Sequence, residues 1–283
     1  MTVSVTGQEK SAVAKILYVS DLDATLLRND KTLSPYTLNA LNSLMERGVL
    51  FTYATARSYV SAREVIGSLV PNVPSIIYNG TFLRNNDTGE QKLLYRFKNG
   101  DGEKILNEIM SHGIYPLVYA YIDGRECFSY VKDKLSVGTL EFVNEHQNDE
   151  RANPVCENDL KRGEIFHFVC IEPEEALRPI YDKLKGDFQC VLYKEQYSDR
   201  WWLEVHPPEA TKANAIVRLA TELGVDKIVC FGDGVNDISM FEIASESYAV
   251  ATACEELKKI ATGVIADNES DGVAKWLVEN AKN

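Results

Sequence analysis

The sequence has no apolar run that approaches the length of a membrane-spanning helix. Positive charge is also scarce: 30 lysines and arginines stand against 42 aspartates and glutamates, so the formal net charge is −12. This acidic excess disfavours nucleic acid and anionic membrane surfaces as partners, because both would repel the protein at long range. A small anionic substrate would then need a local positive group or a metal ion.

Cysteine patterns are absent as well. The six cysteines lie far apart, without a Cys-x-x-Cys pair or a cysteine and histidine spacing typical of a zinc site. We interpret them as reduced core residues of a cytoplasmic protein. Residues 1–15 are polar and have no apolar segment ahead of the first expected strand, which argues against a signal peptide. The chain shows no internal repeat and no low-complexity segment.

What is present is a globular composition, 45% hydrophobic and 25% charged, in a chain of 283 residues, which is long enough for two domains. Three apolar runs are typical of strands: one begins at Ile16, and the others span residues 49–54 and 75–78. Helical spacing separates them, first between the capping pair Ser34-Pro35 and Gly48, then at 60–70. Three strand and helix units predict a parallel sheet with right-handed crossovers.

The pattern changes between residues 85 and 206. Apolar runs at 115–122 and 127–131 flank Asp123-Gly124, a strong two-residue hairpin turn. Further strands are expected at 164–171, 189–193 and 201–205, and helices at 103–112 and 174–185. We interpret this segment as an inserted α+β domain whose sheet is largely antiparallel.

From residue 207 the alternation of helices and strands returns, with a helix at 213–223, a strand at 227–231 and shorter patterns at 248–250, 255–260, 263–266 and 272–281. The predicted fold class is therefore α/β. A Rossmann-like core with a parallel sheet would comprise residues 1–84 plus 207–283, and residues 85–206 would form the inserted domain.

Polar side chains recur where expected strands end: Asp21, Asp23, Thr55, Asp233 and Asp237. Because the carboxyl ends of parallel strands meet at one sheet edge, these groups and Lys212 are expected to converge on one crevice. Plainer interpretations exist for each. Asp21 and Asp23 fit a polar turn, Asp233 and Asp237 fit a turn followed by a helix N-cap, and Lys212 fits a solvated surface lysine.

Over nearly the whole chain this arrangement resembles the haloacid dehalogenase-like phosphohydrolases. The segment from Asp21 to Thr25 resembles the first motif of that family, and Thr55-Ala56-Arg57 resembles the second. Lys212 resembles the third motif, and the segment from Gly232 to Asp237 the fourth. The inserted domain is similar to the type C2 cap of the Cof-like, type IIB branch, as are Asn79-Gly80 and residues 268–273.

The resemblance implies a magnesium-dependent phosphomonoesterase. Asp21 would attack phosphorus and become an aspartyl phosphate, while Asp23 would protonate the leaving alcohol and later take a proton from water. By resemblance the Mg²⁺ ligands are the Asp21 carboxylate, the Asp23 carbonyl and Asp233, with Asp237 orienting the shell or binding through water. Such an ion neutralises the repulsion between carboxylates and a phosphate dianion.

The resemblance also implies groups that hold the substrate, a small phosphorylated metabolite such as a sugar phosphate or a nucleotide-like compound. The phosphate would be bound by the backbone N–H groups at Leu22 and Ala56, the Thr55 hydroxyl, Lys212 and the Asn236 amide. Other substrate contacts are expected from Arg57, Asn79, Gly80, Trp202 and Glu204.

One expected strand carries several aromatic and polar residues. Trp202, Glu204 and His206 would share one face, and Trp201, Leu203 and Val205 the other. One of these faces is expected to be core, so packing explains the aromatic residues about as well as a substrate platform does. His112, His146 and His167 belong to no motif and are expected to be surface or packed residues.

Alanine replaces the glycine that the family usually has at two positions, Ala24 and Ala56. Glycine tolerates positive φ at no steric cost, and alanine does not. We therefore expect both alanines to adopt negative φ.

Two other functions remain open. A phosphotransferase or phosphomutase would pass the phosphoryl group to a second hydroxyl. A catalytically silent regulator would use the same fold to bind a ligand, since fold does not fix function. The presence of both Asp21 and Asp23 argues against a silent protein.

Overall fold

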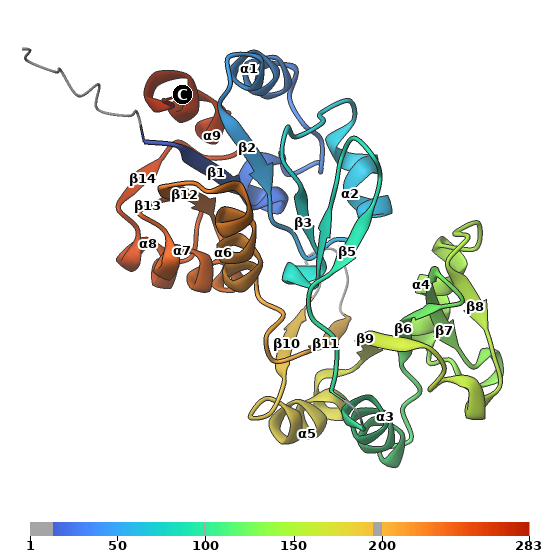
Figure 1. The fold of residues 1–283 in the computed structure, drawn as a ribbon. Helices are drawn as coiled ribbons and strands as arrows, with labels where there is room; N and C mark the ends of the chain where they lie inside the picture. Colours follow the sequence, from blue (N-terminus) through green and yellow to red (C-terminus); the bar gives the residue numbers. More distant parts are fainter. Residues whose placement is uncertain (1–13, 99, 195–199, 283) are drawn as a thin grey trace, which may run out of the picture. The chain divides into compact units, whose positions relative to one another are not determined.

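The computed structural model describes residues 14–98, 100–194 and 200–282 (Figure 1). The expectation of no signal peptide concerned residues 1–15. Of these, residues 1–13 lie outside the described residues. The chain divides into two compact units. The first comprises the chain up to Ile77 together with Arg84–Glu90 and the chain from Ile216 onward, and the second comprises Tyr78–Leu83 and Gln91–Ala215.

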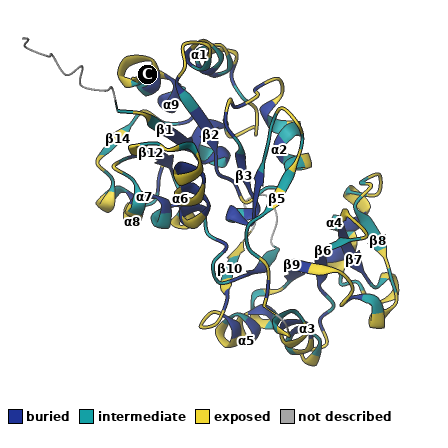
Figure 2. Cartoon of the chain, in the orientation of Figure 1, coloured by how far each residue is buried: buried dark blue, intermediate teal, exposed yellow. Residues whose placement is uncertain are grey.

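The first unit is built on a five-stranded parallel sheet in the order β14-β13-β12-β1-β2. Its strands are β1 (Ile16–Ser20), β2 (Leu50–Tyr53), β12 (Lys227–Gly232), β13 (Glu246–Val250) and β14 (Gly263–Ile265). In Figure 2 the central strands are mostly dark blue, the colour of buried residues. Because β1 and β12 are neighbours, with Ser20 opposite Phe231, the two chain segments that follow them leave the sheet side by side.

Helices cover both faces of this sheet. They are α1 (Pro35–Glu46), α2 (Tyr59–Ile66), α6 (Lys212–Leu223, in this unit from Ile216 on), α7 (Ile238–Ile243), α8 (Glu255–Ile260) and α9 (Gly272–Asn280). Figure 1 shows α1 and α9 on one side of the sheet and α7 and α8 on the other. The start of α1 is as predicted: the Ser34 hydroxyl accepts the Thr37 N–H at 2.9 Å, and Pro35 occupies the first helical position.

The second unit contains a six-stranded sheet in the order β10-β11-β9-β6-β7-β8. Its strands are β6 (Leu117–Ile122), β7 (Arg125–Tyr130), β8 (Ala152–Pro154), β9 (Glu164–Glu172), β10 (Gln189–Lys194) and β11 (Trp201–His206). All pairs are antiparallel except β7 with β8. The predicted hairpin turn joins β6 and β7, where Asp123 and Gly124 both have positive φ (51° and 79°) as a primed turn requires.

One face of this sheet forms the core of the second unit with α3 (Asp101–Ser111) and α5 (Glu174–Leu184). Leu203 and Val205 of β11 belong to that core, together with Phe168 and Cys170 of β9. The predicted alternation along β11 therefore has Trp201, Leu203 and Val205 on the core side. The opposite face, which carries Trp202, contacts Phe142 of α4 (Val137–Glu145).

Shorter elements complete the chain. A third sheet has the order β3-β4-β5, formed by β3 (Ser75–Ile77), β4 (Phe82–Arg84) and β5 (Gln91–Leu93). The described residues also contain the single-turn helices η1 (Leu22–Leu26), η2 (Tyr78–Gly80), η3 (Lys132–Lys134), η4 (Glu157–Asp159) and η5 (Val235–Asp237).

The predicted fold class, a parallel-sheet α/β core with an α+β insertion, is confirmed. Sequence reasoning missed α4 and the short strands β4, β5 and β8. Helix α4 buries only Thr139 and Val143 and contains Gly138, where a Cβ would lie 2.7 Å from Ile171, so its apolar periodicity is weak. The predicted domains, residues 1–84 plus 207–283 and residues 85–206, stay a prediction. The two compact units given above divide the chain at other residues. No helix among the described residues is both long and apolar enough to cross a membrane.

Candidate active site

Three carboxylates gather where β1 and β12 end. The backbone N–H of Asp21 donates to Phe231 O at 2.9 Å, which continues the β1 and β12 pairing by one residue and holds Asp21 beside the segment that follows β12. One carboxylate oxygen each from Asp21, Asp233 and Asp237 lies within 4.8 Å of the other two. Asp21 and Asp237 are buried, at 6% and 0% exposure. Carboxylates this close and this buried repel one another, so their arrangement suits a bound cation.

Asp237 organises the turn after β12. Its Oδ2 accepts the backbone N–H of Asp233 at 2.9 Å and that of Gly234 at 3.1 Å. Its side chain makes no N-cap hydrogen bond to α7, so it holds the preceding loop instead of the helix that the plainer interpretation assigned to it. Gly232 makes this possible, because a Cβ there would lie 2.6 Å from Asp237 Oδ2.

Thr25 connects the loop after β1 to the loop after β12. Its hydroxyl donates to Asp233 Oδ1 at 2.9 Å, and the threonine is 1% exposed. This hydrogen bond fixes the orientation of a candidate metal ligand, a task that second-shell groups commonly perform. Thr25 belongs to the segment that resembles the first family motif, but its contact with Asp233 was not predicted.

Arg57 forms a bidentate ion pair with Asp23. Its Nε donates to Asp23 Oδ2 at 2.8 Å and its Nη2 to Oδ1 at 2.7 Å, while Nη1 donates to Ser61 Oγ at 2.8 Å. Burial opposes the charge on Arg57, but the hydrogen bonds and negative charge of Asp23 outweigh it and raise the pKa of Arg57. The backbone N–H of Arg57 also donates to the Thr55 hydroxyl at 3.1 Å. Contact between Arg57 and substrate stays a prediction; its partner in the structure is Asp23.

The expectation for Ala24 was wrong. Ala24 has φ 55° and ψ 4°, in the left-handed region, whereas Ala56 is not among the residues with positive φ. The single turn η1 follows β1 at once, and its backbone leaves helical geometry at Asp23 and Ala24. The chain closes that turn with the Leu27 N–H donating to Leu22 O at 2.8 Å, so the tight turn imposes the positive φ despite the methyl group.

Comparison with known proteins places this arrangement in a family. A family model described as a haloacid dehalogenase-like hydrolase matches residues 18–277. The chain belongs to the haloacid dehalogenase-like hydrolases.

Relatives of this hydrolase cover nearly the whole chain. It is 26% identical over 268 residues to YitU of Bacillus subtilis, named 5-amino-6-(5-phospho-D-ribitylamino)uracil phosphatase, covering 93% of this chain and 96% of that protein. YwtE of the same bacterium carries the same phosphatase name and is 24% identical over 282 residues, covering 91% and 95%. The solved structure of TM0651 from Thermotoga maritima has a TM-score of 0.76 at 24% identity, covering 96% of this chain and 99% of that one. At that identity the structural likeness supports the fold alone.

The remaining phosphate-binding candidates of this hydrolase occupy different environments. Leu22 and Thr55 are buried beside the sheet edge at 0% and 1% exposure. Lys212 is the first residue of α6 and is 2% exposed, so the interpretation as a solvated surface lysine was wrong. Asn236 lies exposed in η5.

Asn79 and Gly80, two of the predicted substrate contacts, both have positive φ. Gly80 has φ 103°, and a Cβ there would lie 2.1 Å from the Thr211 carbonyl oxygen, so only glycine allows this close approach. Asn79 has φ 51°, and its Oδ1 is buried without a hydrogen-bond partner among the described residues. Trp202 and Glu204 lie on β11 of the second unit, where Glu204 is 8% exposed.

The segment that resembled the family near the end of the chain holds the loop after β1. Asn268 donates from Nδ2 to Leu27 O and to Asn29 Oδ1, both at 3.0 Å. Asp271 accepts the Thr37 hydroxyl at 3.0 Å and pairs with Arg28 at 3.6 Å. Both residues therefore fix the backbone that follows Asp21 and Asp23.

Proposed function

We propose that this haloacid dehalogenase-like hydrolase is a magnesium-dependent phosphatase that cleaves small phosphomonoesters. The observation that carries the proposal is the convergence of Asp21, Asp233 and Asp237 at the ends of adjacent parallel strands. Oxygen-only ligands favour a hard cation, and Mg²⁺ binds through one or two carboxylates and the oxygens of a phosphate. The predicted ligand set, the Asp21 and Asp233 carboxylates with the Asp23 carbonyl, fits this chemistry. When bound, the ion neutralises charge on the phosphoryl oxygens.

Asp21 is the proposed nucleophile. Its carboxylate attacks phosphorus, the bond from phosphorus to the substrate oxygen breaks, and an aspartyl phosphate forms. Asp21 is the first residue after the buried strand β1, and its backbone is still extended, with φ −61° and ψ 161°. A nucleophile held in this way needs little reorganisation to align with the leaving oxygen.

Asp23 is the proposed acid and base. Its side chain is 48% exposed, so water and a leaving alcohol can reach it, whereas that of Arg57 is 17% exposed. Arg57 donates to both carboxylate oxygens and so fixes the orientation of the Asp23 carboxylate. Held in this orientation, Asp23 gives a proton to the leaving alcohol and then takes one from the water that hydrolyses the phosphoenzyme.

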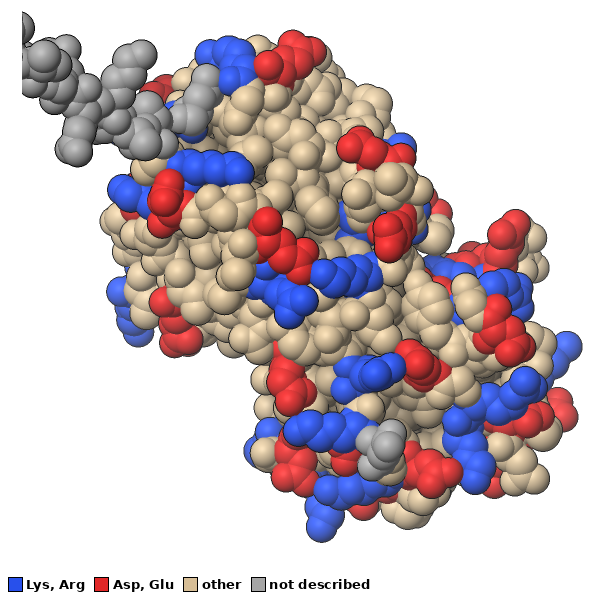
Figure 3. All heavy atoms as spheres, in the orientation of Figure 1, with Lys and Arg blue, Asp and Glu red and all other residues tan. Residues whose placement is uncertain are grey.

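The proposed substrate is a small phosphorylated metabolite, either a sugar phosphate or a nucleotide-like compound. The two Bacillus subtilis relatives are named for a phosphorylated ribitylamino uracil, which combines both features. On the face drawn in Figure 3, acidic and basic side chains are interspersed. A small anion held by local groups fits such a surface and the net charge of −12 better than a long polyanion does.

The test is turnover of an aryl phosphate by wild-type protein and by Asp21→Asn, with and without Mg²⁺. The variant keeps the side-chain volume, so we expect an unchanged circular dichroism spectrum and a loss of activity of at least about 10⁴-fold, because no nucleophile remains. A chelator should abolish wild-type activity, and Mg²⁺ should restore it. Substantial activity in the folded variant would contradict the nucleophile assignment, and transfer of phosphate to an added sugar without release of free phosphate would indicate a phosphotransferase.

A further inference from the structure

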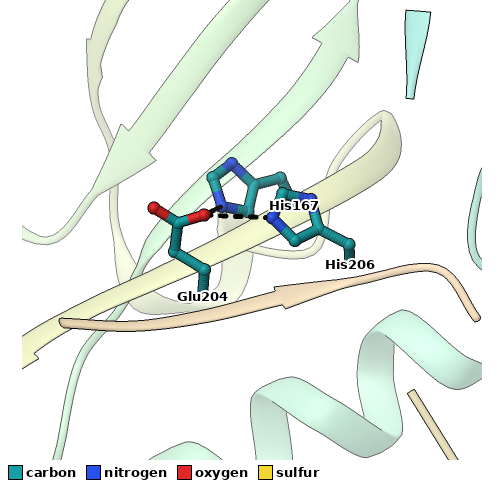
Figure 4. Close-up of side chains that lie close together, drawn as sticks. All are labelled: His167, Glu204 and His206. Atoms are coloured by element: carbon teal, nitrogen blue, oxygen red, sulfur yellow. Dashed lines mark hydrogen bonds and ion pairs between the residues drawn. The ribbon is translucent and has the colours of Figure 1, made fainter. Parts of the chain in front are cut away.

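A second cluster of potential metal ligands lies in the second unit, formed by His167, Glu204 and His206. One ligand atom from each lies within 4.8 Å of the other two. Figure 4 shows the two imidazole rings side by side, with one Glu204 oxygen directed at both. Glu204 Oε2 lies 3.1 Å from His206 Nε2 and 3.7 Å from His167 Nε2. The carboxylate chemistry proposed for Asp21 uses none of these residues.

Strand pairing explains how distant residues meet. In the antiparallel pair of β9 and β11, Val205 is opposite Phe168 and Glu204 is opposite Val169. Side chains alternate along a strand, so His167 and Val169 share a face with Glu204 and His206. This is the face opposite to Leu203 and Val205 in the apolar core, so the three ligands are not part of that core.

Burial makes this cluster unusual. The exposures of His167, Glu204 and His206 are 4%, 8% and 1%. Both ring nitrogens of His167 and the Nδ1 of His206 are buried without a hydrogen-bond partner among the described residues. Buried polar nitrogens normally find partners, and leaving one unpaired is destabilising. A metal ion bound through the Nε2 of His167 would satisfy one of these nitrogens, for which the described residues supply no hydrogen-bond partner.

Neighbouring side chains hold the ligands in place. The ring of His167 stacks on that of His206, with centroids 4.1 Å apart and planes 11° apart, and Tyr119 stacks on the other side of His167 at 5.0 Å. Tyr193 donates its hydroxyl to Glu204 Oε1 at 3.0 Å, which leaves Oε2 directed at the histidines. The hydrogen bond from Tyr193 is an outer contact of the kind that orients metal ligands. The two stacked rings must turn out of parallel for both Nε2 lone pairs to meet at one ion.

The state of the rings also suits metal binding. Burial lowers the pKa of His167 well below the ordinary value for histidine, and His206 acts in the same direction. A neutral His167 ring has a lone pair to offer a metal.

We propose that His167, Glu204 and His206 bind a Zn²⁺ ion, separate from the cation at Asp21, Asp233 and Asp237. Zinc bonds of about 2.1 Å at a tetrahedral angle place two ligand atoms about 3.4 Å apart. The separations of 3.1 and 3.7 Å lie on either side of that value. Two imidazoles and one carboxylate select zinc or a neighbouring transition metal over Mg²⁺, which prefers oxygen ligands. The fourth position of the ion is left to water or a ligand.

Nuclear magnetic resonance of ¹⁵N-histidine-labelled full-length protein provides a direct test, because the chain has only four histidines. After chelation, one equivalent of Zn²⁺ should shift the ring signals of His167 and His206 and leave those of His112 and His146 in place. Addition of Mg²⁺ should not reproduce the shifts. Absence of any shift with Zn²⁺, or shifts confined to the other two histidines, would overturn the proposal.

Variants separate this site from the acidic cluster. His206→Gln should weaken zinc binding by at least about 100-fold, since a direct ligand is worth more than an outer one. His112→Gln, at an exposed histidine, is the matched control, and Asp233→Asn should also keep the zinc affinity. Loss of binding in Asp233→Asn with binding retained in His206→Gln would assign the ion to the acidic cluster and refute the proposal. If His206→Gln does not fold, Glu204→Gln replaces it, and the spectra of the wild-type protein still decide.

Discussion

Replacing Ala24 by glycine should stabilise the protein, although the same change usually destabilises. Ala24 has φ 55° and ψ 4°. A left-handed conformation is unfavourable by roughly 1–2 kcal/mol for an alanine. Glycine removes this strain but loses more conformational entropy on folding, which is unfavourable by roughly 0.4–1 kcal/mol. The difference between the midpoints of the two ranges is a gain in the free energy of unfolding of about 0.8 kcal/mol.

Ala56→Gly is the matched control, because Ala56 is exposed and does not have positive φ. Only the entropic term applies there, so the free energy of unfolding should fall by roughly 0.4–1 kcal/mol. The two substitutions make the same chemical change in neighbouring loops of the site, yet they are expected to have effects of opposite sign. A general effect of glycine could not produce that result.

Urea unfolding of the first unit measures both effects. The chain has three tryptophans, and only Trp276 lies in the first unit, where its ring contacts Phe231 and Tyr248. In a background that carries Trp201→Phe and Trp202→Phe, tryptophan fluorescence therefore reports on that unit alone. We expect the midpoint to rise for Ala24→Gly and to fall for Ala56→Gly at an unchanged slope. If Ala24→Gly lowers the midpoint as much as Ala56→Gly does, Ala24 is not strained and the reasoning fails.

Two further substitutions test the support of the candidate catalytic groups. Thr25→Val removes the hydroxyl that donates to Asp233, so the affinity for a divalent cation, measured by calorimetry, should fall by about 10-fold or more. Thr25→Ser keeps a hydroxyl and should retain most of that affinity. Equal affinities of the valine variant and the wild-type protein would exclude a role for Thr25 in orienting Asp233. Arg57→Lys replaces the bidentate partner of Asp23 with a single point charge, so kcat for an aryl phosphate should fall by about 10-fold or more and the pH profile should change. A rise in KM at constant kcat would instead identify Arg57 as a substrate contact.

Local patterns predicted most of the elements, because apolar periodicity and capping act over a few residues. The Ser34-Pro35 start of α1 and the Asp123-Gly124 hairpin are examples, since each depends on the chemistry of adjacent residues. The same logic failed where tertiary contacts decide. Helix α4 buries only Thr139 and Val143, so its packing leaves little apolar pattern, and Ala24 has positive φ because the turn after β1 requires it.

The convergence of Asp21, Asp233 and Asp237 was also predictable in outline, because parallel strands place their carboxyl ends at one sheet edge. The individual partners were not. That Thr25 would meet Asp233 depends on β1 lying next to β12, and their register is known only from the folded sheet.

The sequence by itself determined the family and most of the strands and helices, since each of these is encoded in short stretches of the chain. Only the tertiary structure brought His167 to Glu204 and His206. Alternation along a strand tells which residues share a face, but not which residue of another strand lies opposite. That second question is decided by register across the whole sheet, and the pairing of β9 with β11 answers it here.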